Sequence, residues 1–210
     1  QRYFVDGSIT YNGASSFGKN SRFSPYYSIG GGWLMNNESF IQNNLPFINE
    51  LRLRYSFGVV GNSSLAPQDY MEVFNRNPQD LYLGGICWTL NGFANPNLKQ
   101  QNTIQHNVGV DLGLFNDRIS IQFNYYNFLT NNTLTDMNLP ISHGFNAVRG
   151  NIGKIRNEGF EWYLNFVLLN NEAKGIRWNL NANITRLRNT IVELSEGFKE
   201  SIKGQFREIG

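Results

Sequence analysis

Apolar and polar residues alternate one by one along several stretches of this chain, and this alternation limits what the chain can fold into. The clearest stretch runs from Ile176 to Thr185, where five apolar residues alternate with five polar ones. Successive side chains of a β-strand point to opposite faces of a sheet, so such a stretch has one apolar and one polar face. No segment sustains the 3.6-residue period of an amphipathic helix. The pattern therefore predicts an all-β fold.

The alternation predicts seven long strands, at residues 2–12, 26–35, 49–61, 104–114, 118–130, 158–168 and 176–187. One short turn of helix is expected at residues 37–41. The connections between the strands run 13, 13, 42, 3, 27 and 7 residues, so long and short ones alternate after the first pair. Asn116 and Asp117 are expected to close the shortest connection as a tight hairpin turn. Such asymmetry is typical of an up-and-down meander in an outer-membrane barrel.

The length of the strands leaves two sheet architectures open. A ten-residue strand tilted by about 45° rises roughly 23 Å, close to the apolar band of about 25 Å on a membrane barrel. A soluble β-sandwich or jelly roll also alternates, although its strands usually have about five or six residues. The apolar face of seven long strands needs cover from lipid or from a second protein layer.

The composition excludes several other classes of protein. Charged residues make up 16% and aromatic residues 14% of the chain, a balance that fits neither a disordered segment nor a coiled coil. The net charge is +2 without a basic cluster, so nucleic acid is not an expected partner. Cys87 is the one cysteine, which excludes an intrachain disulfide and a cysteine-based metal site. A structural or adhesive repeat protein is not supported either, because the sequence shows no fixed-period repeat.

The residues that usually perform catalysis form no recognisable site. The two histidines, His106 and His143, have no evident nucleophile and acid partner. Glu158 and Glu161 are three residues apart, so on a strand they face opposite sides. We therefore expect no enzyme activity, no metal and no cofactor.

Five ordered segments resemble one known family. They are Arg2 to the Phe-Gly-Lys-Asn run ending at Asn20, Leu51 to Asn62, the Asn-Pro-Asn-Leu-Lys run at 95–99, Asn107 to Tyr126, and Asn151 to Trp178. In this order they resemble the C-terminal barrel region of SusC/RagA-like TonB-dependent outer-membrane transporters. Two departures stand out: Gln100-Gln101 replace the usual Trp-Glu, and Asn124 replaces a frequent Asp. They leave the predicted fold unchanged but weaken any role assigned to those positions.

The resemblance implies a barrel of about twenty-two strands in the outer membrane of a Gram-negative bacterium. Residues 1–210 would then form part of the barrel domain, without the plug, and strands 2–12 and 176–187 would need neighbours. The resemblance also implies active import of oligosaccharides or peptides, energy from TonB, and a SusD-like surface lipoprotein as a lid. Lipid would cover the apolar face. The alternative that stays open is a soluble β-sandwich that binds carbohydrate.

Within this interpretation, the polar face lines a hydrated lumen. The expected lumen-facing residues are Arg52, Arg54, Asn107, Asp111, Gln122, Asn124, Glu161, Asn165, Arg177, Asn179, Asn181 and Asn183. Their amides offer both hydrogen-bond donors and acceptors, which suits neutral polyhydroxyl cargo.

Aromatic residues suggest two further roles. The long connection at 62–103 is the expected contact for cargo or lid through Tyr70, Tyr82, Trp88 and Phe93, although these side chains could also form the small core of the loop. Interface girdles could be formed by Tyr3, Tyr11, Trp33, Tyr55, Phe115, Phe128 and Trp178. The alternative for this second set is packing against cross-strand neighbours.

Overall fold

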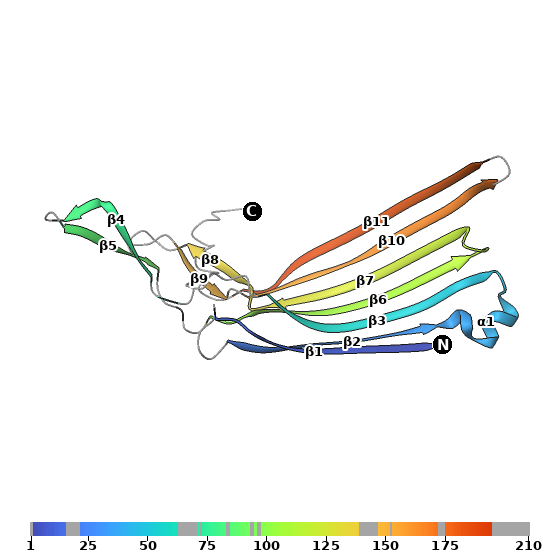
Figure 1. Cartoon of the computed structure of the whole chain (residues 1–210), viewed down its shortest axis with the longest axis horizontal. Helices are drawn as coiled ribbons and strands as arrows, with labels where there is room; N and C mark the ends of the chain where they lie inside the picture. Colours follow the sequence, from blue (N-terminus) through green and yellow to red (C-terminus); the bar gives the residue numbers. More distant parts are fainter. Residues whose placement is uncertain are drawn as a thin grey trace, which may run out of the picture.

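The structure is a computed structural model that describes residues 2–15, 22–62, 71, 73–82, 85–92, 95, 98–138, 147–151, 153–171 and 175–194. Seven strands form one antiparallel sheet: β1 (Tyr3–Gly13), β2 (Phe23–Leu34), β3 (Ile48–Asn62), β6 (Gln101–Leu114), β7 (Ile119–Asn131), β10 (Gly153–Asn171) and β11 (Ile176–Leu194). Their order in the sheet is their order along the chain, so the sheet is an up-and-down meander (Figure 1). The predicted all-β fold and its seven strands are confirmed.

Two short hairpins lie within the connections that the sequence predicted as loops. β4 (Val73–Tyr82) pairs with β5 (Gly85–Gly92), and β8 (Leu134–Asn138) pairs with β9 (Ala147–Asn151). Figure 1 shows both hairpins beyond the same end of the sheet, which we call the long-loop end. The alternation did not reveal them because β4 mixes amides, charges and a proline, and β8 and β9 have five residues each.

The last two strands are longer than the alternation predicts. β10 and β11 have 19 residues each and extend past the predicted limits of 168 and 187. They pair from Gly153 with Leu194 to Asn171 with Ile176, with two register shifts. Strand pairing depends on backbone hydrogen bonds, so it continues where the alternation of side chains stops.

The register places most of the apolar residues of the seven strands on one face. One row across the sheet contains Tyr3, Trp33, Leu53, Val110, Phe123, Trp162 and Ile184. This apolar face lies open: Ile9 is 84% and Val5 77% exposed. The buried hydrophobic residues of the described ranges are Ile41 and Leu98, and neither forms a second layer over the sheet. A β-sandwich would pack this face against another sheet, so the described residues do not support that alternative.

The connections at the other end of the sheet, the short-turn end, are compact. The helix expected at 37–41 is confirmed as a 3-10 turn at Met35–Asn37 followed by α1 (Ser39–Asn44). The tight turn expected at Asn116 and Asp117 is also present, with φ angles of 56° and 61°. Asn and Asp tolerate this left-handed region better than most residues.

One carboxylate, Glu38, fastens the first two strands to this end. It accepts hydrogen bonds from the hydroxyl of Tyr3 (3.2 Å) and the indole N–H of Trp33 (3.1 Å). It also pairs with Arg2 at 3.3 Å. Tyr3 and Trp33 stack on each other with ring centroids 6.0 Å apart, so the edge strand begins in a fixed position.

Glycine makes room for an aromatic ring on the polar face. Gly159 of β10 lies opposite Tyr126 of β7, and the ring of Tyr126 extends over it. A Cβ added to Gly159 would lie 2.6 Å from the hydroxyl of Tyr126 and inside contact distance of the backbone oxygen of Arg186. The backbone atom cannot move aside without disturbing the β10–β11 pairing, so this position requires glycine.

We therefore predict that Gly159→Ala lowers the free energy of unfolding by about 1–3 kcal/mol, the usual cost of overpacking. The matched control is Gly7→Ala on β1, because a Cβ there would meet its nearest backbone oxygen at an ordinary 3.6 Å. Denaturant unfolding of the two variants measures the difference. Equal stability of the two variants would show that the close contact at Gly159 is unimportant.

Candidate functional site

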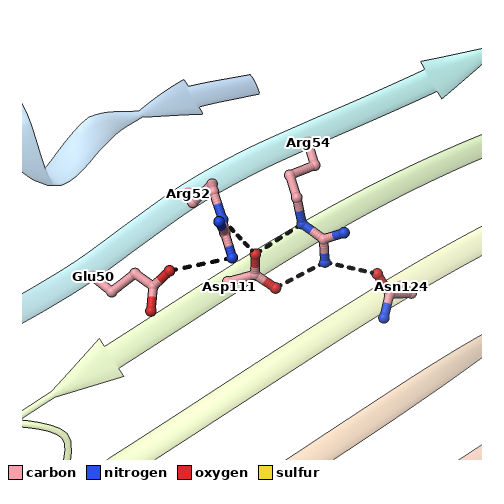
Figure 2. A network of polar contacts seen from close by, with 5 residues as sticks. All are labelled: Glu50, Arg52, Arg54, Asp111 and Asn124. Carbon is pink, nitrogen blue, oxygen red and sulfur yellow. Dashed lines mark hydrogen bonds and ion pairs between the residues drawn. The ribbon is translucent and has the colours of Figure 1, made fainter. Parts of the chain in front are cut away.

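A network of charged groups crosses the polar face of the sheet. Asp111 of β6 accepts hydrogen bonds from Nε of Arg52 and from Nε and Nη2 of Arg54, each at 2.8 Å. Arg54 also donates to Oδ1 of Asn124 at 3.1 Å, and Arg52 pairs with Glu50 at 3.4 Å. Figure 2 shows these side chains joining three adjacent strands, β3, β6 and β7. We call these five residues the arginine network.

The register explains why this network forms. Arg52 lies opposite Asp111, while Arg54 lies opposite Gly109, which in turn lies opposite Asn124. With no side chain at Gly109, the guanidinium of Arg54 can cross β6 and reach Asn124. A Cβ at Gly109 would lie 2.9 Å from both Nη2 of Arg54 and Oδ1 of Asn124.

The charges of the network balance. Two guanidiniums face the carboxylates of Asp111 and Glu50, and the side chain of Asp111 is only 4% exposed although it lies on an open polar face. Charge-assisted hydrogen bonds of this kind are short and strong. Each arginine uses its Nε and Nη2 groups within the sheet, so the network holds the three strands together.

A shallow hollow of about 780 Å³ lies beside the network on the same face. It is lined by Arg54, Ser56, Asn107, Asn124, Tyr126, Phe128, Asn157, Glu161 and Leu187. Amides and a hydroxyl provide donors and acceptors, and the two aromatic rings provide flat apolar area. This combination suits a polar molecule that carries many hydrogen-bonding groups, such as a sugar or a peptide backbone.

The sequence-predicted polar residues are brought together on this face. The register places the row Arg52, Asp111, Gln122, Tyr163 and Asn183 next to the row Arg54, Gly109, Asn124, Glu161 and Thr185. Strand alternation adds the remaining predicted members, Asn107, Asn165, Arg177, Asn179 and Asn181. All twelve therefore share one face, and their contact with a lumen stays a prediction.

One aromatic prediction is wrong. Phe128 was expected in an interface girdle, but it lies on the polar face and lines the hollow. It is an even-numbered residue of β7, like Gln122 and Asn124, so the alternation of the strand itself could have revealed its side.

The other expected girdle residues fall into two groups. Tyr3, Tyr11, Trp33, Tyr55 and Trp178 lie on the apolar face, while Phe115 lies in the β6–β7 turn and stacks on Phe47. Tyr11 stacks on Phe23 at 5.6 Å and Tyr3 on Trp33, which bears out cross-strand packing for these two. A position at a membrane interface stays a prediction for this set.

The expected contact residues of the long connection are only partly described. Trp88 lies on β5, and its side chain is 66% exposed. It is therefore not part of a small core formed by the described residues. Tyr82 ends β4, but its side chain lies outside the described part, as do Tyr70 and Phe93 altogether.

A small core at the base of the long loops joins three of the family-like segments. Leu98 is fully buried against Ala14 and Leu134. The side chain of Asn151 accepts from the backbone N–H of Lys99 (2.9 Å) and donates to its carbonyl (3.0 Å), so it pairs with the backbone as a strand would. Sequence periodicity gives no sign of this contact, because its partners are 52 residues apart.

The two departures from the family pattern at 100 and 101 also belong to this base. Gln100 is 6% exposed and accepts a hydrogen bond from the hydroxyl of Tyr26 at 2.5 Å. Gln101 accepts from the backbone N–H of Leu134 at 3.4 Å. The side-chain amides of Gln100 and Gln101 therefore have a structural role: they bind neighbouring groups at the base of the long loops.

The described residues contain no cluster of three or more metal-ligating side chains. Glu158 and Glu161 lie on opposite faces, and His106 lies on the apolar face, where its Nδ1 is 3.0 Å from the hydroxyl of Tyr55. Within the same ranges, no helix has the length and apolar character to cross a membrane.

We predict that Asp111→Asn lowers the free energy of unfolding by about 1–3 kcal/mol, because two guanidiniums lose their shared anion. Adding Arg54→Gln should cost less than the sum of the two single changes, with a coupling of about 0.5–3 kcal/mol. Denaturant unfolding of the single and double variants measures this coupling. Gln122→Ser, at an exposed neighbour in the same row, is the control. Additive effects would show that the network does not act as a unit.

Comparison with known proteins gives one consistent family. The family model described as TonB dependent receptor-like, β-barrel, matches residues 2–203. A TonB-dependent receptor of Formosa agariphila is 31% identical over 200 residues, which cover 93% of this chain and 18% of that protein. The TonB-dependent receptor SusC of Bacteroides thetaiotaomicron is 28% identical over 203 residues, covering 93% of this chain and 20% of that protein.

A solved structure agrees with the sequence relatives. The structure of the RagAB peptide transporter matches with a TM-score of 0.84 at 27% identity, covering 94% of this chain and 21% of that chain. This chain thus spans about a fifth of the length of such relatives, 18% to 20% for the two receptors above. The resemblance to SusC and RagA predicted from the sequence is confirmed, and the chain belongs to the TonB-dependent receptor-like β-barrel family.

Proposed function

We propose that this chain forms part of the wall of an outer-membrane barrel that imports nutrients with energy delivered through TonB. The observation that supports this best is the two-faced sheet, in which seven long strands carry an open apolar face and a polar face. The apolar face is stable against hydrocarbon, and the polar face is stable against water. Because the chain belongs to the TonB-dependent receptor-like family, we propose that the barrel is of the TonB-dependent type.

The edges of the sheet support a larger closed barrel. β1 and β11 each pair with a single neighbour among the described strands. Unpaired backbone groups are costly in lipid, so barrel walls close on themselves. We therefore propose further strands beside β1 and β11, in a barrel of about 22 strands that encloses a plug. Residues 1–210 would then belong to a single barrel domain.

The two ends of the sheet suggest an orientation. Outer-membrane barrels have short turns on the periplasmic side and longer loops outside the cell. The short-turn end contains the β6–β7 and β10–β11 turns, and the long-loop end contains both extra hairpins (Figure 1). We place the long-loop end outside the cell, where a SusD-like lipoprotein would lie over the mouth.

The cargo we propose is an oligosaccharide or a peptide. The hollow on the polar face offers amides, a hydroxyl and two aromatic rings, which suit a flexible molecule rich in hydrogen-bonding groups. One relative is described as a peptide transporter, which agrees with the peptide part of this range.

The first test of this proposal removes binding groups from the hollow. Asn107→Leu combined with Tyr126→Ala, introduced into the full-length receptor, should reduce cargo uptake by about tenfold, the effect of losing about 1.4 kcal/mol of cargo contact. Whole cells that take up a labelled oligosaccharide or peptide provide the measurement, with the amount of receptor in the outer membrane determined in parallel.

Val108→Ile is the matched control, because Val108 lies next to Asn107 on the opposite, apolar face. Normal uptake by the double variant at a normal receptor level would contradict the role of the hollow. Uptake that persists in cells without TonB would contradict the proposed energy source.

The second test concerns the exposed aromatic of the β4–β5 hairpin. Trp88→Ala should weaken cargo uptake or binding of the SusD-like lipoprotein by about tenfold, because exposed Trp residues often anchor contacts. Phe74→Leu, a conservative change of another exposed side chain on the hairpin, is the control. If both uptake and lipoprotein affinity stay unchanged in Trp88→Ala, the hairpin does not contact cargo or lid through Trp88.

A further inference from the structure

Arginines on the apolar-face side of β10 and β11 lie in the half of these strands that is nearer the long-loop end. Arg186 lies opposite Phe160, and Arg188 lies opposite Glu158. Both arginines project to the same side as Ile184, whose neighbour across the sheet is Trp162. The change from Ile184 to Arg186 is therefore a sharp change from apolar to basic along one face of one strand.

A hollow of about 250 Å³ lies between these residues. It is lined by Tyr125, Glu158, Gly159, Phe160, Arg186 and Arg188. Aromatic side chains provide apolar area, and the two guanidiniums provide a rim of positive charge. The hollow lies on the opposite side of the sheet from the arginine network and from the proposed cargo surface.

The positive charge of this hollow is only partly compensated. Arg188 is 74% exposed and lies 3.9 Å from the carboxylate of Glu158, which is a long ion pair. Arg186 pairs with no carboxylate in the described part of the chain. An anionic ligand would complete the donors of Arg186 and Arg188.

The position of the hollow matches the edge of the apolar band. Along β11, the residues on this face are apolar from Trp178 to Ile184 and basic at Arg186 and Arg188. The row through Ile184 also contains Trp162, Phe123, Val110 and Leu53. Basic residues on the lipid-facing side of a barrel cost much less at the interface than at the middle of the membrane. The two arginines therefore mark the level of lipid headgroups on β11.

We propose that Arg186 and Arg188 bind the phosphate of a phosphorylated lipid in the outer leaflet of the membrane. The proposal rests on the function proposed above, which places this face against lipid and the long-loop end outside the cell. A guanidinium forms two parallel hydrogen bonds with a phosphate. Tyr125 and Phe160 lie beside the first segment of an acyl chain, and Trp162 and Ile184 lie along its path.

The test uses the full-length receptor purified in detergent and lipid A that carries two phosphates as the probe. Native mass spectrometry at increasing probe concentration gives the affinity. The double variant Arg186→Gln/Arg188→Gln should bind about 30-fold more weakly, because each basic residue near an anionic lipid surface contributes a few-fold. Arg186→Lys/Arg188→Lys should fall between the two, since it keeps the charge but loses the planar donor fork.

Arg177→Gln is the matched control, since it removes an exposed arginine from the polar face of the same strand near the short-turn end. It should bind the lipid as the unchanged receptor does. Dephosphorylated lipid A should bind the unchanged receptor weakly, and millimolar inorganic phosphate should not displace the phosphorylated lipid. Equal binding by the double glutamine variant, equal binding of the dephosphorylated lipid, or full displacement by inorganic phosphate would overturn the proposal.

Cargo uptake by the same variants separates this proposal from the proposed function. A double variant that imports normally but binds lipid weakly supports the lipid site alone. A receptor that binds the phosphorylated lipid but imports nothing would contradict the import function and leave the lipid site intact.

Discussion

The pleat of the β-strand is the constraint on which the rest of this structure depends. It sends alternate side chains to opposite faces, so seven strands in register gather their apolar residues on one side. In the described ranges nothing packs over that side, and residues such as Val5 and Ile9 are more than three quarters exposed, at 77% and 84%. Burial of such a surface is what the hydrophobic effect favours most strongly in folding and association. The surface therefore needs cover, and we propose that the hydrocarbon of a membrane supplies it.

The polar face is stabilised in a different way. Its strands are tied by charge and by close aromatic contacts rather than by a core: Arg54 crosses Gly109 to reach Asn124, and Tyr126 lies over Gly159. The small core that does exist lies at the base of the long loops around Leu98. The sheet thus has a wall that is fixed by its own side chains and a polar surface that remains open beside it.

Local pattern predicted the strands, the turn at Asn116 and the short helix, because each depends on residues close in the sequence. It also predicted which polar residues share a face, since alternation alone decides that. The arginine network needed the register between β3 and β6, which sets Arg52 opposite Asp111 and is not encoded in either strand alone. The pairing of Asn151 with Lys99 is non-local for the same reason. The family resemblance included the segment with Lys99 and the segment with Asn151, but it did not predict that the two segments contact each other. The predicted girdle position of Phe128 is wrong because aromatic character does not decide which face a strand residue occupies, whereas its place in the alternation does.

The claim that the apolar face contacts hydrocarbon can be tested directly with spin labels on β6. Single labels at Val108 and Val110 report on the apolar face, and labels at Gln105 and Asn107 report on the polar face, in the full-length receptor with Cys87 replaced and reconstituted in bilayers. Oxygen concentrates in hydrocarbon, while a charge-neutral nickel complex stays in water. We predict frequent collisions with oxygen and few with nickel at 108 and 110, and lower oxygen accessibility at 105 and 107. Labels at 108 and 110 that are reached by nickel, or shielded from both reagents by protein, would contradict the account.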